Sequence, residues 1–196
     1  MTKIYTRVGD HGLTKQVSGQ MVAKTDLQIV ALGEIDELQS YLGVVVTSLQ
    51  PNQGDLGNEL CDVQRKLYVL EADISVKRHQ EMAAADTTWL EQRVDAFMAA
   101  TPDLKEFILP GGSPAGAHLQ YARTVARRAE RSAVALNTVQ PLDPAILTYL
   151  NRLSDYLFAM ARYVNHRDGY VEIPSNKEKA ERQAARAARR QAKSEL

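Results

Sequence analysis

Apolar residues recur along most of the chain at the three- and four-residue spacing of an α-helix, and strand-like alternation is confined to the first few residues. Between about residues 56 and 76 the steps between apolar residues alternate between four and three. This spacing is typical of a helix that packs along one seam of a bundle. The expected helices cover about residues 26–49, 56–76 and 87–100, and two more begin near residues 113 and 143. The pattern predicts an all-α fold.

The starts of the last two helices have clear end signals. Ser113 and Asp143 can each accept a hydrogen bond from a free backbone N–H group of the first turn, and each is followed by a proline at the first helical position. Five helices with short connections predict an up-and-down bundle in a single domain. The apolar face expected for the first helix consists of Leu27, Val30, Ala31, Ile35, Leu38, Leu42, Val45 and Leu49.

The composition of the 196 residues, 44% hydrophobic and 24% charged, is that of an ordinary globular domain. Its 24 basic and 24 acidic residues balance, so the net charge gives no reason to expect a nucleic-acid or membrane partner. The balance is uneven, because residues 177–196 hold seven basic and three acidic residues. The single cysteine, Cys61, excludes an intramolecular disulfide, and "MTKIYTRVGD" is not a leader sequence. A cytoplasmic protein is therefore expected.

A stripe of small and acidic residues runs along the expected first helix. Gly33, Asp36, Ser40 and Gly43 fall at positions that share one face. Each glycine inside a helix costs about 1 kcal/mol relative to alanine, so the stripe favours a surface that another element approaches closely. An exposed polar face with tolerated glycines is the alternative, and the pattern alone leaves both open.

The segment "ARTVARRAER", residues 122–131, crowds four arginines into one part of the fourth helix. On a helical wheel, Arg123, Arg127, Arg128, Glu130 and Arg131 occupy a sector of about 160°. A solvated charged face is one interpretation. The absence of lysine favours another, because the planar guanidinium binds phosphate or carboxylate through two hydrogen bonds. The opposite sector holds Leu119, Ala122, Val125, Ala126, Ala129, Ala133 and Leu136.

A glycine-rich turn near the N-terminus, "YTRVGDHGLT", has the features of an anion-binding loop. Gly9 and Gly12 enclose two polar residues, and Thr6 and Thr14 stand on either side. Such a loop can present several backbone N–H groups and hydroxyls to a phosphate, and Lys24 could add a positive charge. The turn is not a Walker A sequence, and taken alone it could be an ordinary turn.

Together, these segments resemble the PduO-type ATP:cob(I)alamin adenosyltransferases. The resemblance runs from Ile4 to about Asn165 and rests on motifs in a fixed order. The N-terminal turn is followed by "GEIDELQS", by "FILPGG" at residues 107–112, by the arginine segment and by "LNRLSDYLFAMARYVN" at residues 150–165. The ordered set is far more specific than any one of its members.

The resemblance implies a homotrimer of five-helix bundles with active sites at the subunit boundaries. In this family the Co(I) of reduced cobalamin attacks the 5′ carbon of ATP, with formation of four-coordinate cob(II)alamin as the preceding step, and the products are adenosylcobalamin and triphosphate. The implied cofactor is Mg²⁺, whose ligands the residues do not define. The implied partners are a cob(II)alamin reductase and an enzyme that accepts adenosylcobalamin.

The resemblance also assigns site residues. Phe107 should lie against the lower face of the corrin ring and keep the nucleotide base away from cobalt, and Asp36 should pair with Arg123 near the site. Arg127 joins these three as a catalytic residue. The implied ATP-binding positions are Thr6, Arg7, Val8, Gly9, Thr14, Lys15, Lys24, Arg127, Arg128, Ala129, Glu130, Arg131 and Asn151.

The sequence departs from the family at two positions. His11 stands where a lysine is usual and Gln28 where an arginine is frequent, so weaker phosphate contacts are expected there. The family domain is expected over residues 1–176, with the ATP loop in residues 1–25, and residues 177–196 form a basic, alanine-rich tail of unassigned role.

Two other kinds of helical protein are alternatives to this assignment. A di-metal bundle of the ferritin type needs Glu-x-x-His pairs, and the sequence contains none. A nucleic-acid-binding bundle could use the basic tail together with the arginine segment, and its affinity would fall steeply as salt rises. It is the weaker alternative, and no nucleic-acid partner is expected.

Overall fold

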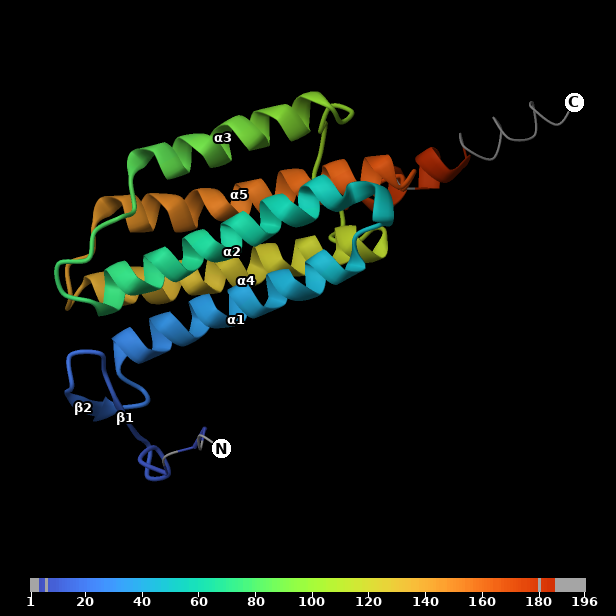
Figure 1. The fold of residues 1–196 in the computed structure, drawn as a ribbon. Helices are drawn as coiled ribbons and strands as arrows, with labels where there is room; N and C mark the ends of the chain where they lie inside the picture. Colours follow the sequence, from blue (N-terminus) through green and yellow to red (C-terminus); the bar gives the residue numbers. More distant parts are fainter. Residues whose placement is uncertain (1–3, 6, 180, 186–196) are drawn as a thin grey trace, which may run out of the picture.

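The computed structural model describes residues 4–5, 7–179 and 181–185 as a bundle of five long helices with a small hairpin in front of it (Figure 1). Successive helices run in opposite directions, which confirms the all-α, up-and-down bundle predicted from the sequence. The helices are α1 (Leu27–Ser48), α2 (Gly54–Ser75), α3 (Ala84–Ala99), α4 (Pro114–Asn137) and α5 (Pro144–Arg167), with a 3-10 turn at Pro51–Gln53.

The core is built around α4, which packs against both α1 and α5. All seven residues of its predicted apolar sector are buried, and four of them are alanines. These small side chains let the neighbouring helices approach closely and so fix the rotation of α4 about its axis. Deeper in the bundle, the buried Tyr156 of α5 donates a hydrogen bond of 2.9 Å to Glu59, which also pairs with Arg93 at 2.8 Å. This contact joins α5, α2 and α3.

The helix starts agree with the predicted capping residues. The side chain of Ser113 accepts a hydrogen bond from Gly116 N, and that of Asp143 accepts one from Ala145 N. Each such cap contributes about 1 kcal/mol to helix stability. The third helix begins three residues earlier than expected, at Ala84, because the carboxylate of Asp86 accepts a 2.9 Å hydrogen bond from Ala83 N.

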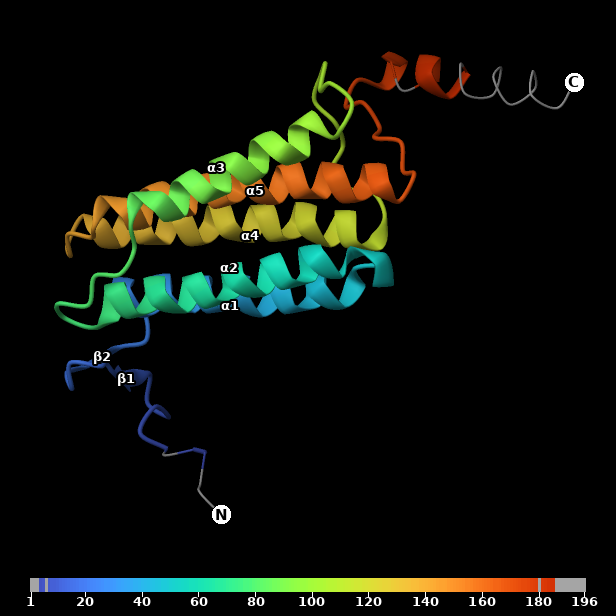
Figure 2. The same ribbon diagram turned by 45° about the horizontal axis from the view of Figure 1, so that its top comes forward.

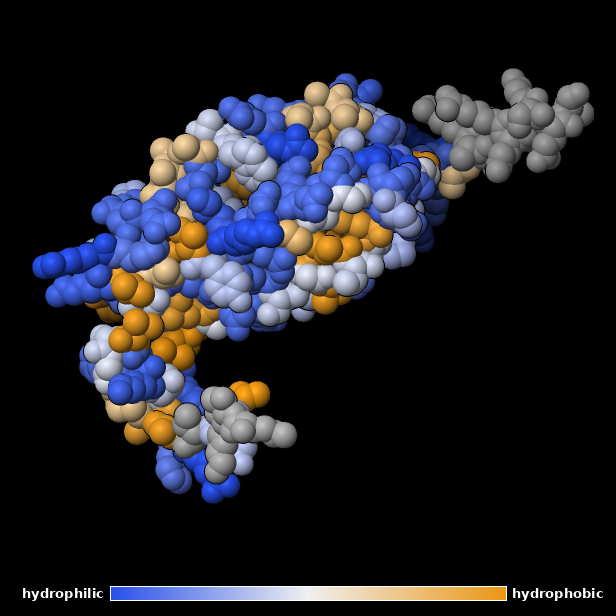
Figure 3. Space-filling model, in the orientation of Figure 1, coloured by the Kyte–Doolittle hydropathy of each residue, from blue (hydrophilic) through white to orange (hydrophobic). Residues whose placement is uncertain are grey.

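The first turn of α1 differs from the prediction. Leu27 and Val30, assigned to the apolar face, are 38% and 36% exposed, whereas Gln28 is buried. Its amide Nε2 donates to Ile74 O at 3.1 Å and to Gln140 Oε1 at 3.0 Å, so it links α1 to the ends of α2 and α4. Figure 3 shows hydrophobic surface near this turn, where the N-terminal hairpin meets the bundle.

The N-terminal hairpin was not predicted. Its strands are β1 (Leu13–Lys15) and β2 (Met21–Ala23), which pair antiparallel with Thr14 opposite Val22. Three-residue strands are too short to give a clear alternation in the sequence. The hairpin projects away from the bundle beyond the start of α1 in both ribbon views (Figures 1 and 2).

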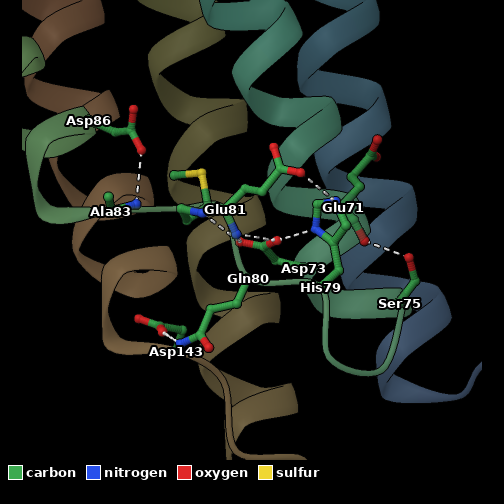
Figure 4. Close-up of polar contacts among 10 residues, drawn as sticks. Glu71, Asp73, Ser75, His79, Gln80, Glu81, Ala83, Asp86 and Asp143 are labelled. Atoms are coloured by element: carbon green, nitrogen blue, oxygen red, sulfur yellow. Dashed lines mark hydrogen bonds and ion pairs between the residues drawn. The ribbon is translucent and has the colours of Figure 1, made fainter.

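The connection between α2 and α3 is organised by Asp73 (Figure 4). Its carboxylate accepts hydrogen bonds from Met82 N at 2.8 Å, from Glu81 N at 3.0 Å and from His79 Nδ1 at 2.5 Å. Burial disfavours the charged form of Asp73, but these hydrogen bonds outweigh it and lower the pKa of the carboxyl. The turn is therefore held by one ionised side chain.

Candidate active site

Three arginines form an unpartnered row along α4. Arg123, Arg127 and Arg131 follow one another at intervals of four residues, so they lie on one side of the helix. Within the described residues none of the three makes an ion pair, and Arg123 donates only to Gln120 Oε1, at 3.1 Å. Burial, followed by the neighbouring charge of Arg127, lowers the pKa of Arg123. The row is therefore a concentration of positive charge with no ion-pair partner in the part of the chain that the structure describes.

Arg128 differs from the other arginines of the segment. Its guanidinium binds the carboxylates of Glu34 and Glu37 on α1, and these hydrogen bonds raise its pKa. It lies about 100° around the helix from Arg127, on the side that faces α1. The structure thus separates Arg128 from the row with which the sequence grouped it.

Glu130 and Asn151 come together beside the row. The amide Nδ2 of Asn151, from the exposed side of α5, donates a 2.7 Å hydrogen bond to Glu130 Oε1. Ala129, which was also assigned to the site, is fully buried and offers only its backbone. The packing of α4 on α5 therefore places a carboxylate and an amide next to the arginines.

The glycine-rich turn is joined to Lys24. The backbone N–H of Lys24 donates to Gly12 O at 2.9 Å, and a Cβ at Gly9 would lie 3.2 Å from Lys24 Nζ. Arg7 and Gly12 both adopt positive φ angles, 64° and 77°, which fold the loop tightly. Lys24 therefore lies beside the glycine-rich turn, and anion binding by this loop stays a prediction.

The other predicted residues of this segment are placed as follows. Val8 and Lys15 are exposed, and Thr14 is half-buried in β1. His11 is exposed in the turn, whereas the side chain of Gln28 points into the end of the bundle and does not face the loop. Thr6 lies outside the described residues.

Phe107 lies at the other end of the bundle from the hairpin. It belongs to the connection between α3 and α4, which lies at that end of the bundle in Figure 1, and the residue is 88% exposed. Arg127 is 13 positions beyond the start of α4, a rise of roughly 20 Å along the helix. Within one chain, Phe107 is therefore far from both the hairpin and Arg127.

The predicted pair between Asp36 and Arg123 is not formed within one chain. Asp36 lies near α2, where burial, followed by the charge of Asp36, raises the pKa of Glu71 to about 7. Arg123 lies about 140° around α4 from Arg128, the residue that marks the side facing α1. Arg123 therefore does not lie on the side of α4 that carries the contact with α1. Near Asp36, Gly33 is exposed and has open space where a Cβ would stand.

Two buried polar residues were missed in the sequence. Arg162 and Asn165 stand in the last turns of α5 and are 2% and 1% exposed. Their signal is present in "FAMARYVN", where an arginine and an asparagine three positions apart interrupt an apolar run. The spacing places both on one side of the helix, toward the connection that carries Phe107.

The profile of the cobalamin adenosyltransferase family matches residues 4–164. The chain belongs to this family. A corrinoid adenosyltransferase of Bacillus subtilis (strain 168) is 42% identical to it over 176 residues, which cover 87% of this chain and 91% of the relative. A cobalamin adenosyltransferase of Cupriavidus metallidurans is 39% identical over 173 residues, with 88% and 94% covered. The predicted family and enzyme class are confirmed.

Solved structures of a PduO-type ATP:corrinoid adenosyltransferase from Lactobacillus reuteri share the fold of this enzyme. A variant with histidine in place of a phenylalanine, complexed with cobalamin and ATP, has a TM-score of 0.86 and 34% identity, covering 89% of this chain and 97% of that one. A variant with lysine in place of an arginine, complexed with ATP, has a TM-score of 0.84 and 35% identity, covering 88% and 100%. Among the described residues of this enzyme, no helix is long and apolar enough to span a bilayer.

Proposed function

We propose that this enzyme transfers the 5′-deoxyadenosyl group of ATP to the Co(I) of reduced cobalamin and releases intact triphosphate. The observation that carries the proposal is the row of Arg123, Arg127 and Arg131, which has no carboxylate partner in the described chain. A row of guanidinium groups fits a chain of phosphates, since each group can donate two hydrogen bonds to phosphate oxygens. The relatives' complexes with ATP and cobalamin support the same substrates.

The protein must stabilise the negative charge of the triphosphate leaving group. Attack of Co(I) on the 5′ carbon breaks the carbon–oxygen bond and leaves the electron pair on a triphosphate that carries several negative charges. Fixed positive groups that already surround the leaving group stabilise this charge without reorganisation. In-line placement of cobalt and the 5′ carbon supplies the rest of the acceleration. A general base has no part in this step, because no proton is removed.

The active site is completed between subunits of a homotrimer. The hairpin with Gly9 and Lys24 projects away from the bundle (Figure 2), and no hydrogen bond or ion pair joins it to the arginine row among the described residues. A neighbouring copy could bring its hairpin to this row, and the ATP contacts assigned to Arg7, Val8, Gly9, Thr14, Lys15 and Lys24 would then come from that copy. Thr6 is assigned to the same loop. Arg128 holds α4 against α1 and so supports the row beside it.

The pair between Asp36 and Arg123 belongs to the same interface. The two side chains do not pair with each other in one chain, and neither has an ion-pair partner among the described residues. Gly33, which is exposed and has open space where a Cβ would stand, leaves room near Asp36 for another subunit to approach. A pair between subunits would neutralise Arg123, whose pKa burial and Arg127 lower in the single chain.

Phe107 acts on cobalamin and not on ATP. An exposed phenylalanine is apolar and has no donor atom for cobalt, so it can occupy the lower face of the corrin ring and exclude both the nucleotide base and water. Removal of the lower axial ligand gives four-coordinate cob(II)alamin. This form is easier to reduce, because the ligand no longer raises the orbital that accepts the electron. A reductase must supply that electron, and an adenosylcobalamin-dependent enzyme consumes the product.

Magnesium fits the site as an ion carried mainly by the substrate. The described residues contain no group of three His, Cys, Asp or Glu side chains that could enclose a metal. Mg²⁺ usually keeps several waters and binds one or two carboxylates together with substrate phosphates. Glu130 supplies a carboxylate beside the arginine row, and Asn151 orients it through the 2.7 Å hydrogen bond. The ion would add positive charge next to the leaving group.

The proposed reaction is tested by incubating the protein with chemically reduced cobalamin, Mg²⁺ and ATP under strict exclusion of oxygen. We expect the absorption spectrum of Co(I) to be replaced by that of adenosylcobalamin at a rate proportional to enzyme concentration. An otherwise identical sample with a non-hydrolysable analogue that lacks the 5′ oxygen serves as the control. Failure to form a carbon–cobalt bond with ATP would refute the proposal.

A further inference from the structure

The ring of Phe107 has almost no packing of its own. It is 88% exposed, so its position depends on the backbone of the connection between α3 and α4. A cavity of about 280 Å³ lies under this connection, lined in part by residues 101–106 and by Arg162. Apolar packing against the core therefore does not hold the connection in place. Polar contacts must therefore hold the connection.

Arg162 holds the start of the connection. Its Nη2 donates a 2.7 Å hydrogen bond to Pro102 O, and its Nε donates to both carboxylate oxygens of Glu172, at 3.1 and 3.0 Å. Its Nη1 lies 3.4 Å from Met98 Sδ, near the end of α3. One buried guanidinium thus binds α3, the connection and the segment that follows α5.

Asn165, one turn further along α5, holds the end of the connection. Its Nδ2 donates to Gly111 O at 3.0 Å, and its Oδ1 accepts from Ser113 N at 3.0 Å. A Cβ at Gly112 would lie 1.9 Å from Asn165 Oδ1, and one at Gly116 would lie 1.8 Å from it. The two glycines are therefore required for this side chain to reach the backbone.

The segment that follows α5 completes the support. Ser175 N donates to Phe107 O at 2.9 Å, and Leu109 N donates to Ile173 O at 2.8 Å. These two hydrogen bonds hold the backbone immediately before and after Ile108. Glu172 of the same segment is bound to Arg162, so the segment that holds the backbone around Ile108 is itself attached to α5.

We propose that Arg162 and Asn165, together with residues 172–175, form a clamp that positions Phe107 under the corrin ring. The inference rests on the role of Phe107 given above. Arg162 and Asn165 contact neither substrate in this account, so they are positioning residues. The clamp fixes both ends and the middle of the connection, and a loosened clamp lets the ring move away from cobalt. Water or the nucleotide base then returns to the lower axial position.

Two independent variants loosen the clamp. Arg162→Lys keeps the charge but cannot bind Pro102, Glu172 and Met98 at once. Ser175→Pro removes the N–H group that donates to Phe107 O and fixes φ at this position, which is exposed and lies outside the helices of the bundle. The matched controls are Arg152→Lys, which alters an arginine elsewhere on α5, and Ser175→Ala, which keeps the N–H group.

The readout separates positioning from folding. We expect both clamp variants to bind ATP normally and to lose rate when the assay starts from cob(II)alamin with a reduced flavin. The loss should be at least about tenfold for Arg162→Lys, which weakens charge-assisted hydrogen bonds, and about fivefold for Ser175→Pro, which removes a neutral one. With Co(I) prepared chemically, the loss should be several times smaller. Electron paramagnetic resonance of the ATP-bound cob(II)alamin complex should show less of the four-coordinate form. Amide hydrogens of Leu109 and Ser175 should exchange faster in Arg162→Lys, while those of α4 stay protected.

Phe107→Ala is the benchmark for these measurements. If Phe107→Ala keeps the full four-coordinate signal, Phe107 does not exclude the lower axial ligand, and the proposed function of the clamp is refuted as well. If Phe107→Ala loses the signal while Arg162→Lys and Ser175→Pro keep it, the clamp alone is refuted. The double variant Phe107→Ala/Arg162→Lys should be no slower than Phe107→Ala, because Arg162 acts through the ring. An additive loss would also overturn the clamp.

Discussion

Arg128 of α4 binds Glu34 of α1, whereas Arg127, the residue before it, makes no ion pair within the described residues. One peptide bond thus separates an arginine that joins two helices from an arginine that is free to bind an anion. The difference follows from rotation by about 100° per residue on a helix whose orientation the buried alanines fix. The two arginines therefore form a matched pair for mutagenesis.

We expect Arg127→Lys to lower kcat/KM by about 10- to 150-fold, the equivalent of one lost charge-assisted hydrogen bond at roughly 1.5–3 kcal/mol. An ammonium group cannot reproduce the two-pronged contact with phosphate. The measurement is initial rate against ATP concentration with Co(I) in excess.

Arg128→Lys is the control for this change. It should lower the free energy of unfolding by about 0.2–1 kcal/mol, as for a solvent-exposed ion pair, and reduce activity far less. Equal losses of activity in the two variants would contradict the separate roles assigned to these neighbours.

Asp36 and Arg123 should be coupled only in the assembled protein. Light scattering should give three times the 21.8 kDa mass of the chain, and Asp36→Asn and Arg123→Ala should each weaken the trimer. If the two side chains pair across the interface, the effects in the double variant are smaller than the sum of the single effects. A fully active monomer, or strictly additive effects on trimer dissociation, would argue against the shared site.

The stability of the enzyme should fall as pH rises through the range in which Glu71 titrates. Burial, followed by the charge of Asp36, raises the pKa of Glu71 from 4.5 to about 7. Between these values the folded chain binds more protons than the unfolded chain, so its stability decreases with pH and is constant above the folded pKa. Because solvent screens the half-buried carboxyl, the change should be about 1 kcal/mol.

The test is urea unfolding between pH 4.5 and 8 at a fixed protein concentration. Glu71→Gln cannot titrate, so its stability should vary less across this range and exceed that of the unmodified protein at the upper end. The same slope in both proteins would show that Glu71 does not carry the effect.

The activities of two truncated chains should show that residues 172–175 are needed for catalysis and that residues 177–196 are not. A chain that ends at Asn176 keeps the hydrogen bonds of Glu172 and Ser175, so it should retain most activity and all ATP affinity. Among the described residues it loses the 3.2 Å hydrogen bond of Gln183 Nε2 to Glu172 O and the 3.1 Å pair of Lys179 with Glu106, but not the contacts of Arg162 with Glu172. A chain that ends at Gly169 removes the whole segment and should behave like Phe107→Ala. Full activity of the shorter chain would contradict the support assigned to this segment.

Most of the fold could be read from the sequence because helical spacing and capping residues report local structure. Ser113 and Asp143 marked helix starts correctly, and the apolar sector of α4 is buried throughout. The same spacing misplaced Leu27 and Val30, because a hydrophobic pattern shows which residues avoid water but not which element covers them. Gln28 satisfies its buried amide through residues 46 and 112 positions away, which no local pattern reveals.

The site was only partly predictable for a related reason. A helical wheel groups residues by angle and says nothing of partners, so it could not separate Arg128, which binds α1, from Arg127. The pair assigned to Asp36 and Arg123 came from family resemblance, which does not say whether two residues meet within one chain. Arg162 and Asn165 escaped notice because their partners lie in other segments of the chain: backbone groups of the connection for both residues, and the carboxylate of Glu172 for Arg162.

The phosphate-containing products show most directly whether ATP loses its triphosphate in one piece. The arginine row is proposed to hold the whole leaving group while cobalt attacks the 5′ carbon, so no bond between phosphorus atoms and bridging oxygens needs to break. Phosphorus-31 magnetic resonance of an anaerobic reaction with Co(I), Mg²⁺ and ATP should show one triphosphate for each adenosylcobalamin formed. Initial release of AMP, or of pyrophosphate together with phosphate, would contradict the account.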